Sequence, residues 1–134
     1  MLTFYLILSL LFIQDPDYPK KLQELNVTYQ NCLDEGKAMV NCSRDFLSQM
    51  GELMDRILMD FQENSPKEKS DLILQNQSEW EVKIQEKFNL INQRLDSLTL
   101  SSGAIPHDEL MFAYNDKARI FEERIIELID QLKY

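Results

Sequence analysis

The sequence predicts an all-α protein: an antiparallel bundle of about four helices, one short and three longer, joined by one disulfide. Three glycines and four prolines in 134 residues are too few for a loop-rich β protein. The chain is 44% apolar and rich in residues that favour helices, which is enough to form a buried core. Apolar side chains recur at spacings of three and four in four segments, and no segment shows sustained strand alternation.

The first helix is expected from about Tyr18 to Glu35. Pro19 suits its first turn, and Gly36 suits its C-terminal stop. The spacing places four side chains on one stripe, which we expect to face the core: Leu22, Leu25, Tyr29 and Cys32.

The second helix is expected from about Ala38 to Gln62. Its apolar stripe is the longest run at helical spacing: Met39, Cys42, Phe46, Met50, Leu53, Ile57 and Phe61. Leu47, Met54 and Leu58 widen the stripe, as expected for a helix that packs on more than one neighbour. Gly51 lies within this helix, and we expect it to permit the close approach of another helix.

The third helix is expected to begin with a capping box, in which Ser65 is the N-cap, Pro66 the first helical residue and Glu68 the returning acid. It is expected to end near Ser97. Its inward stripe contains one polar residue among apolar ones: Ile73, Gln77, Trp80, Ile84, Phe88, Ile91, Leu95 and Leu98.

A loop is expected from Ser101 to Pro106, followed by a fourth helix with acidic residues in its first turn, where the helix dipole favours them. This helix has a heptad-like stripe of Tyr114, Ala118, Phe121, Ile125, Leu128 and Leu132. The stripe is shorter than three heptads, so it indicates bundle core rather than a free coiled coil.

Residues 1–14, MLTFYLILSLLFIQ, contain no charged side chain. This run is shorter than the roughly 20 residues that span a bilayer, so it is interpreted as the apolar region of a signal peptide. No Lys or Arg precedes it and no small-x-small cleavage site follows it, and a buried N-terminal helix is the alternative. We therefore expect a leader over 1–14, a single helical domain over 15–134, a periplasmic or secreted location, and no stable membrane span in the mature chain.

The two cysteines, Cys32 and Cys42, are separated by nine residues that include Gly36. A structural zinc site takes four ligands, and the only histidine, His107, heads a distant helix. Reactive thiols favour CxxC or a cationic setting, whereas acids follow Cys32 here. A structural disulfide across a helical turn is the favoured interpretation, with two buried free thiols as the alternative.

The formal net charge of −9 and the pI near 4.6 argue against binding to nucleic acid or to an anionic membrane surface. They permit a basic protein partner, although acidic residues also serve simply to solvate helix faces. No phosphate-binding loop, metal-ligand set or nucleophile–base pair is visible. We therefore expect a non-enzymatic protein without a cofactor, whose oligomeric state the sequence leaves open.

Gln77 lies one turn before Trp80, the only tryptophan, on the inward stripe of the third helix. A buried amide needs hydrogen-bond partners. We expect a structural role, in which backbone groups or tyrosine hydroxyls satisfy Gln77 and Trp80 is a central core residue. A ligand site is the alternative.

Five segments carry a resemblance to a known family: Cys32-Leu33, Val40-Asn41-Cys42, Gln77 with Trp80, Ser102-Gly103-Ala104 and Arg124-Ile125-Ile126-Glu127-Leu128. In these the chain resembles the LprI-like lysozyme inhibitor N-terminal domain family, which are small exported bacterial helical proteins. The family has an aromatic-Arg-Asp run after its tryptophan, where this chain reads Lys83-Ile84-Gln85. The resemblance therefore implies that the family's polar cluster near the tryptophan is mostly missing here.

The resemblance implies an exported binding protein, with lysozyme inhibition as one activity found among relatives. An acidic surface would serve that activity by electrostatic complementarity to a basic partner such as lysozyme. The alternative function is a structural or self-associating cell-envelope protein, with Met54, Leu58 and Met59 as the exposed association face.

Overall fold

The computed structural model describes residues 16–132, and the predicted leader over 1–14 lies outside the described residues. The described residues form four helices: α2 (Tyr18–Asp34), α3 (Met39–Asn64), α4 (Lys67–Ser102) and α5 (His107–Leu132). They contain no strand. The predicted all-α bundle of one short and three longer helices is confirmed.

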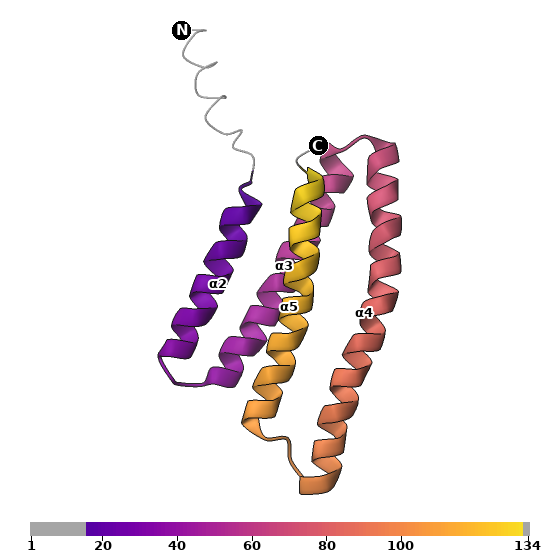
Figure 1. Ribbon diagram of the computed structural model, residues 1–134. Coiled ribbons are helices and arrows are strands. Elements are labelled where there is room, and N and C mark those ends of the chain that lie inside the picture. Colours follow the sequence, from indigo (N-terminus) through magenta and orange to yellow (C-terminus); the bar gives the residue numbers. More distant parts are fainter. Residues whose placement is uncertain (1–15, 133–134) are drawn as a thin grey trace, which may run out of the picture.

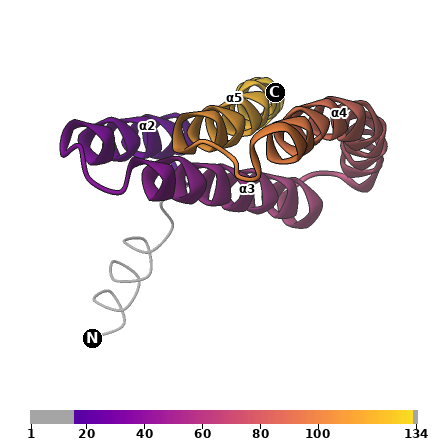
Figure 2. The ribbon, with the colours of Figure 1, turned by 90° about the horizontal axis from the view of Figure 1, so that it is seen from below.

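Helices that follow one another in sequence run in opposite directions, so α3 and α5 run parallel to each other (Figure 1). These two helices make the most extensive contact and form the centre of the fold. Figure 2 shows α2, α5 and α4 side by side in one row, with α3 lying across α2 and α5. α2 and α4 therefore occupy opposite edges and do not contact each other.

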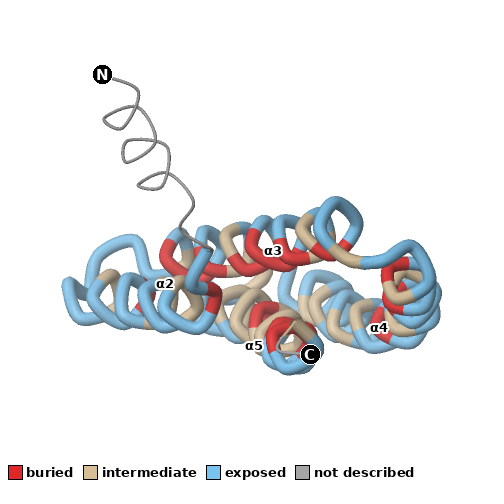
Figure 3. The backbone as a smooth tube through the Cα atoms, turned by 90° about the horizontal axis from the view of Figure 1, so that it is seen from above, coloured by how far each residue is buried: buried red, intermediate tan, exposed pale blue. Residues whose placement is uncertain are grey.

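The core lies mainly along α3, whose buried face is turned toward the other helices (Figure 3). The largest fully buried side chains are Phe46, Phe61, Met50, Leu53, Ile57, Ile125 and Leu128. A wide apolar face is needed because α3 packs on all three of its neighbours. Met54 is buried as part of that face, so the predicted association face is wrong: among its three residues only Met59 is largely exposed.

The expected role of Gly51 is also corrected. A Cβ atom built on Gly51 would lie 3.6 Å from the Phe121 ring, which is an ordinary van der Waals contact. Since an alanine would fit there, the close contact between α3 and α5 does not depend on glycine.

The first helix boundaries follow the prediction to within one residue. The Asp17 carboxylate accepts a hydrogen bond from the Lys20 backbone N–H and caps α2, and Pro19 lies in the first turn. The chain reverses at Gly36, which has φ +67°, and α3 begins after Ala38, which has φ +48°. Both conformations are left-handed, so this turn contains one non-glycine residue under backbone strain.

Both predicted ends of the third helix are corrected. Pro66 has an extended ψ of 145° and precedes α4, and no side-chain hydrogen bond caps that end, so the predicted capping box is not formed. At the other end α4 continues to Ser102 instead of stopping near Ser97. Hydroxyls of the last turns donate to carbonyls four residues earlier and so remain compatible with the helix: Ser97 to Gln93, Thr99 to Leu95 and Ser102 to Leu98.

The second half of α4 extends beyond the centre of the bundle and packs mainly on α5 (Figure 1). Its inward stripe keeps the predicted register, yet after Ile84 no residue of α4 is fully buried. A single neighbour can cover only part of such a stripe. Within residues 16–132, no helix combines the length and the apolar character that crossing a membrane requires.

Candidate functional site

Cys32 and Cys42 form a disulfide that joins the end of α2 to the first turn of α3. Their Cα atoms lie 5.8 Å apart, within the usual range for a disulfide. The metal and free-thiol alternatives for this pair are thereby excluded. Elsewhere in residues 16–132, no group of three or more His, Cys, Asp or Glu side chains is arranged to hold a metal ion.

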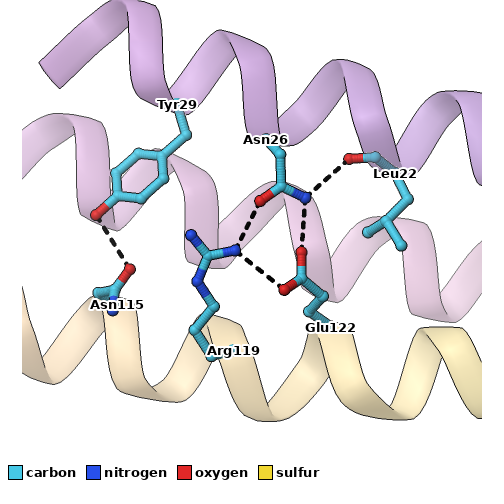
Figure 4. A network of polar contacts seen from close by, with 6 residues as sticks. All are labelled: Leu22, Asn26, Tyr29, Asn115, Arg119 and Glu122. Atoms are coloured by element: carbon cyan, nitrogen blue, oxygen red, sulfur yellow. Dashed lines mark hydrogen bonds and ion pairs between the residues drawn. The ribbon is translucent and has the colours of Figure 1, made fainter. Parts of the chain in front are cut away.

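A polar network joins α2 to α5, and it consists of Asn26, Arg119 and Glu122 (Figure 4). The Nη1 atom of Arg119 donates to Asn26 Oδ1 at 2.6 Å and to Glu122 Oε1 at 3.0 Å. The Nδ2 atom of Asn26 donates to Glu122 Oε2 at 2.6 Å. The three side chains thus form a closed ring of charge-assisted hydrogen bonds, which fixes the position of α2 along α5.

Aromatic rings lie beneath this network. The Tyr29 and Phe46 rings are stacked, with centroids 4.2 Å apart, and the Arg119 guanidinium carbon lies 5.0 Å from the Phe46 centroid. The Tyr29 hydroxyl lies 3.1 Å from Ser43 Oγ and donates to Asn115 Oδ1 at 3.3 Å. Tyr29 therefore connects three helices, α2, α3 and α5.

The Asn26 network was not predicted from the sequence. The sequence contains one indication of it: Asn26 follows Leu25, a residue of the inward stripe, and Arg119 and Glu122 are spaced to lie one helical turn apart. Their pairing across helices, however, depends on how α2 lies on α5.

A second polar cluster joins α4 to α5 and surrounds Arg124, which is only 3% exposed. Its guanidinium donates from Nε to Gln77 Oε1 at 2.8 Å, from Nη2 to Asn76 Oδ1 at 2.9 Å, and from Nη1 to Glu127 Oε2 at 3.0 Å. The guanidinium carbon lies 5.6 Å from the Trp80 ring centroid. We call these five residues the Arg124 cluster.

Two expectations about this region are corrected. The Gln77 carbonyl accepts from Arg124 and not from the backbone or a tyrosine, and its amide donates to Glu81 at 3.2 Å. Trp80 is half-buried at the edge of the core rather than at its centre, with Phe121 6.1 Å away. A polar cluster of another origin lies beside the tryptophan, because its Arg124 comes from α5. The expected loss of the family's own polar cluster stays a prediction.

An open pocket of about 380 Å³ lies beside the cluster, lined by Asn76, Glu79, Trp80, Lys83, Arg124, Glu127 and Gln131. All three guanidinium nitrogens of Arg124 are already hydrogen-bonded within the cluster. Among the described residues, no buried side-chain nitrogen or oxygen lacks a hydrogen-bond partner. The Arg124 cluster therefore joins α4 to α5 by hydrogen bonds. The structural role expected for Gln77 and Trp80 stays a prediction.

A third polar contact holds the start of α2. The Tyr18 hydroxyl donates to Asp60 Oδ2 on α3 at 2.8 Å. Burial, and next the hydrogen bond to Asp60, raise the pKa of Tyr18 from 10.0 to about 12. The ordinary unfolded value is near 10, so folding favours the protonated phenol.

This pKa shift predicts a loss of stability in alkali. A group whose pKa is raised on folding contributes its full stabilisation below the unfolded pKa and loses it as the pH rises through the folded one. We expect the wild-type free energy of unfolding to fall by about 2 kcal/mol more than that of Tyr18→Phe between about pH 9 and pH 12. Urea unfolding of both chains at each pH measures this, and the lysines common to both cancel in the difference. Parallel pH curves for the two chains would contradict the assignment.

The charged surface is uneven because the fold withdraws cations from solvent. Arg124 is buried, and four further cations are half-buried: Lys21, Lys69, Lys117 and Arg119. Among the described acids none is buried, and three are half-buried: Asp60, Glu109 and Glu122. The Lys117 ammonium donates to Asn92 at 2.7 Å, and burial lowers the pKa of Lys117. The exposed surface is therefore more acidic than the composition alone indicates.

One face of α5 combines exposed acidic and apolar side chains, and it is turned away from α3 (Figure 3). We call it the α5 stripe: Phe112, Asp116, Glu123, Ile126, Glu127 and Asp130, all exposed. Phe112 is 53% exposed and Ile126 49% exposed. Phe112 and Ile126 are thus exposed large apolar side chains that lie among acidic ones on this face of α5.

These features define a class of protein: a disulfide-linked four-helix bundle whose buried polar residues join its helices and whose exposed charge is acidic. Comparison of the chain with protein-family models, with curated proteins and with solved structures gave no match. The resemblance to the LprI-like family thus stays a prediction from the sequence.

Proposed function

We propose that the protein is an exported, non-enzymatic binding protein of the LprI-like kind, which engages a basic protein partner through the α5 stripe. The family resemblance points to lysozyme as that partner. The observation that carries the proposal is the stripe itself, in which acids accompany the exposed Phe112 and Ile126.

The two kinds of side chain have different tasks in such a contact. Acidic groups at the rim speed the encounter with a basic protein and give specificity, while buried apolar groups supply most of the lasting attraction. Since the Debye length falls from about 30 Å at 0.01 M salt to about 8 Å at physiological ionic strength, binding should weaken as salt is added.

Two further observations support the proposal: the first concerns the compartment and the second the acidic character of the surface. The disulfide between Cys32 and Cys42 is of a kind that persists in oxidising compartments. Arg119 and Arg124, the two arginines of the polar networks, are occupied in joining helices. The proposed alternative of a self-associating envelope protein loses support, because Met54 is buried.

The test is lysozyme activity on bacterial cell walls with excess purified protein at low and moderate salt. We expect inhibition that is stronger at low salt. Asp116→Asn/Glu123→Gln should weaken inhibition by about tenfold, which corresponds to ~1.4 kcal/mol of binding free energy.

The matched control is Asp45→Asn/Glu52→Gln, which removes the same charge from exposed positions on α3. It should weaken inhibition by less than about threefold, because distant charges are screened. Equal effects of the two variants would refute the α5 stripe as the contact face, and absence of inhibition by the wild-type protein at both salts would remove lysozyme as the partner.

A further inference from the structure

α2 lies at the edge of the bundle and is held there by side chains of α3 and α5. A second copy of the chain presents the same α3 and α5 side chains. Within residues 16–132, α2 has two covalent links to the other helices: the turn Glu35–Ala38 and the disulfide. It makes no contact with α4. Its contacts reach across the fold, from Tyr18 to Asp60 and from Asn26 to Arg119. If α2 moved to another molecule, each of these contacts could form again with the same partner residues.

The turn between α2 and α3 can be closed, as in the structure, or open, with its residues continuing the helix. Its backbone is strained in the closed form, and its residues favour the helix of the open form. Gly36 and Ala38 both adopt left-handed φ values, +67° and +48°, and the latter is unfavourable for a residue with a Cβ atom. The turn contains no proline, and Glu35, Lys37 and Ala38 are good helix formers. Opening the turn into continuous helix would therefore release strain in the backbone.

The disulfide opposes this opening. Cys32 and Cys42 are 10 positions apart, and their Cα atoms lie 5.8 Å apart across the closed turn. In one continuous helix the same positions would be separated by about 15 Å, at a rise of 1.5 Å per residue. That exceeds the roughly 7 Å limit for a disulfide, so an open chain cannot form this bond with itself.

We infer that the face of α3 and α5 beneath α2 is an interaction surface for α2 of a second copy, and that the Cys32–Cys42 disulfide keeps the protein monomeric by holding its turn closed. Exchange of a terminal element between identical chains is a low-cost route to a dimer. In the exchanged dimer Cys32 of one chain meets Cys42 of the other, so oxidation there joins the two chains. Each bond forms when two thiols pass two electrons and two protons to a disulfide oxidant, such as glutathione disulfide, which becomes two thiols.

The test refolds reduced, unfolded protein at increasing protein concentrations in a buffer of reduced and oxidised glutathione. Remaining thiols are then alkylated, and the products are separated by electrophoresis without reductant. We expect covalent dimers whose fraction rises with protein concentration. Cleavage with trypsin after Lys37 separates the two cysteines, and mass spectrometry should find only Cys32–Cys42 pairs in the dimer.

Two substitutions in the turn should shift the dimer fraction in opposite directions. Gly36→Ala adds strain to the closed turn without any steric contact within 4 Å, so dimers should appear at an at least fivefold lower concentration, ~1 kcal/mol. Ala38→Gly relieves the closed turn and should require a concentration about fivefold higher. Monomers alone at every concentration in all three chains would overturn the inference, as would dimers joined by Cys32–Cys32 or Cys42–Cys42 pairs or an identical dimer fraction in the two variants.

Discussion

Replacement of Arg124 by alanine is expected to destabilise the protein by about 3 kcal/mol. The substitution leaves the buried Gln77 carbonyl without its partner, which alone costs about 1–3 kcal/mol, and it removes the guanidinium that covers Trp80. The aliphatic stem of Arg124 is also lost from the contact between α4 and α5. Urea unfolding followed by circular dichroism measures the loss.

The matched control within the same cluster is Glu127→Gln. The Glu127 side chain is 59% exposed, so water can replace its bond to Arg124. We expect this substitution to change the free energy of unfolding by less than about 1 kcal/mol, as for other exposed ion pairs. If Arg124→Ala were no more harmful than Glu127→Gln, the Arg124 cluster would not lock the helices.

The bond between Gln77 and Arg124 can be isolated with a double-mutant cycle. Gln77→Leu alone leaves the buried Nε of Arg124 unpaired and should cost about 2 kcal/mol. The double variant Gln77→Leu/Arg124→Met replaces both partners with apolar groups, and such replacements are often nearly neutral. Its loss should therefore be well below the sum of the single losses, and strict additivity would contradict direct coupling.

The sequence predicted the helices and most of the core because both follow from local periodicity. On α3, six of the seven residues of the expected stripe are buried. The exception is Met39, the first residue of the helix, which is 37% exposed. The cysteine pair was predicted for the same reason: stripe positions on both sides of a glycine must meet when the chain reverses.

The partners of buried polar residues could not be predicted, because they depend on how distant helices are placed. Gln77 and Arg124 are 47 positions apart, and Asn26 and Arg119 are 93 apart. Periodicity indicates that Gln77 faces inward, yet it does not say which helix lies opposite. The late end of α4 was missed because residues that usually favour turns, Ser97, Thr99 and Ser102, bond here to carbonyls within the helix.

The α5 stripe was overlooked for a related reason. The predicted stripes contain only residues that point inward, and the acidic charge was interpreted as a property of the whole chain, either for a basic partner or for solvation of helix faces. Phe112 and Ile126 fall outside the heptad-like stripe, and only the packing of α5 between α2 and α4 shows that they stay exposed. An exposed apolar residue becomes informative once its position among the neighbouring helices is known.

The second large effect is expected at Phe46, the residue on which α2, α3 and α5 meet. Phe46 is 1% exposed, its ring stacks on Tyr29, and the Arg119 guanidinium covers it. Phe46→Ala should therefore destabilise the protein by about 3–5 kcal/mol, the range for a large side chain deleted from a packed core. Because the lost ring supports Tyr29 and Arg119 together, α2 should be released first, and its backbone amides should exchange with solvent faster than those of α4 and α5.

The same substitution at an exposed site separates packing from binding. Phe112→Ala removes an identical side chain from the α5 stripe, where the ring is 53% exposed, so the free energy of unfolding should change by less than about 0.5 kcal/mol. If the stripe is the contact face, Phe112→Ala should weaken lysozyme inhibition by about tenfold or more, which is ~1.4 kcal/mol. Urea unfolding and lysozyme inhibition are measured on both variants. If Phe112→Ala were as unstable as Phe46→Ala, Phe112 would belong to the core. If Phe112→Ala were stable and inhibited fully, the contact face would not lie on α5.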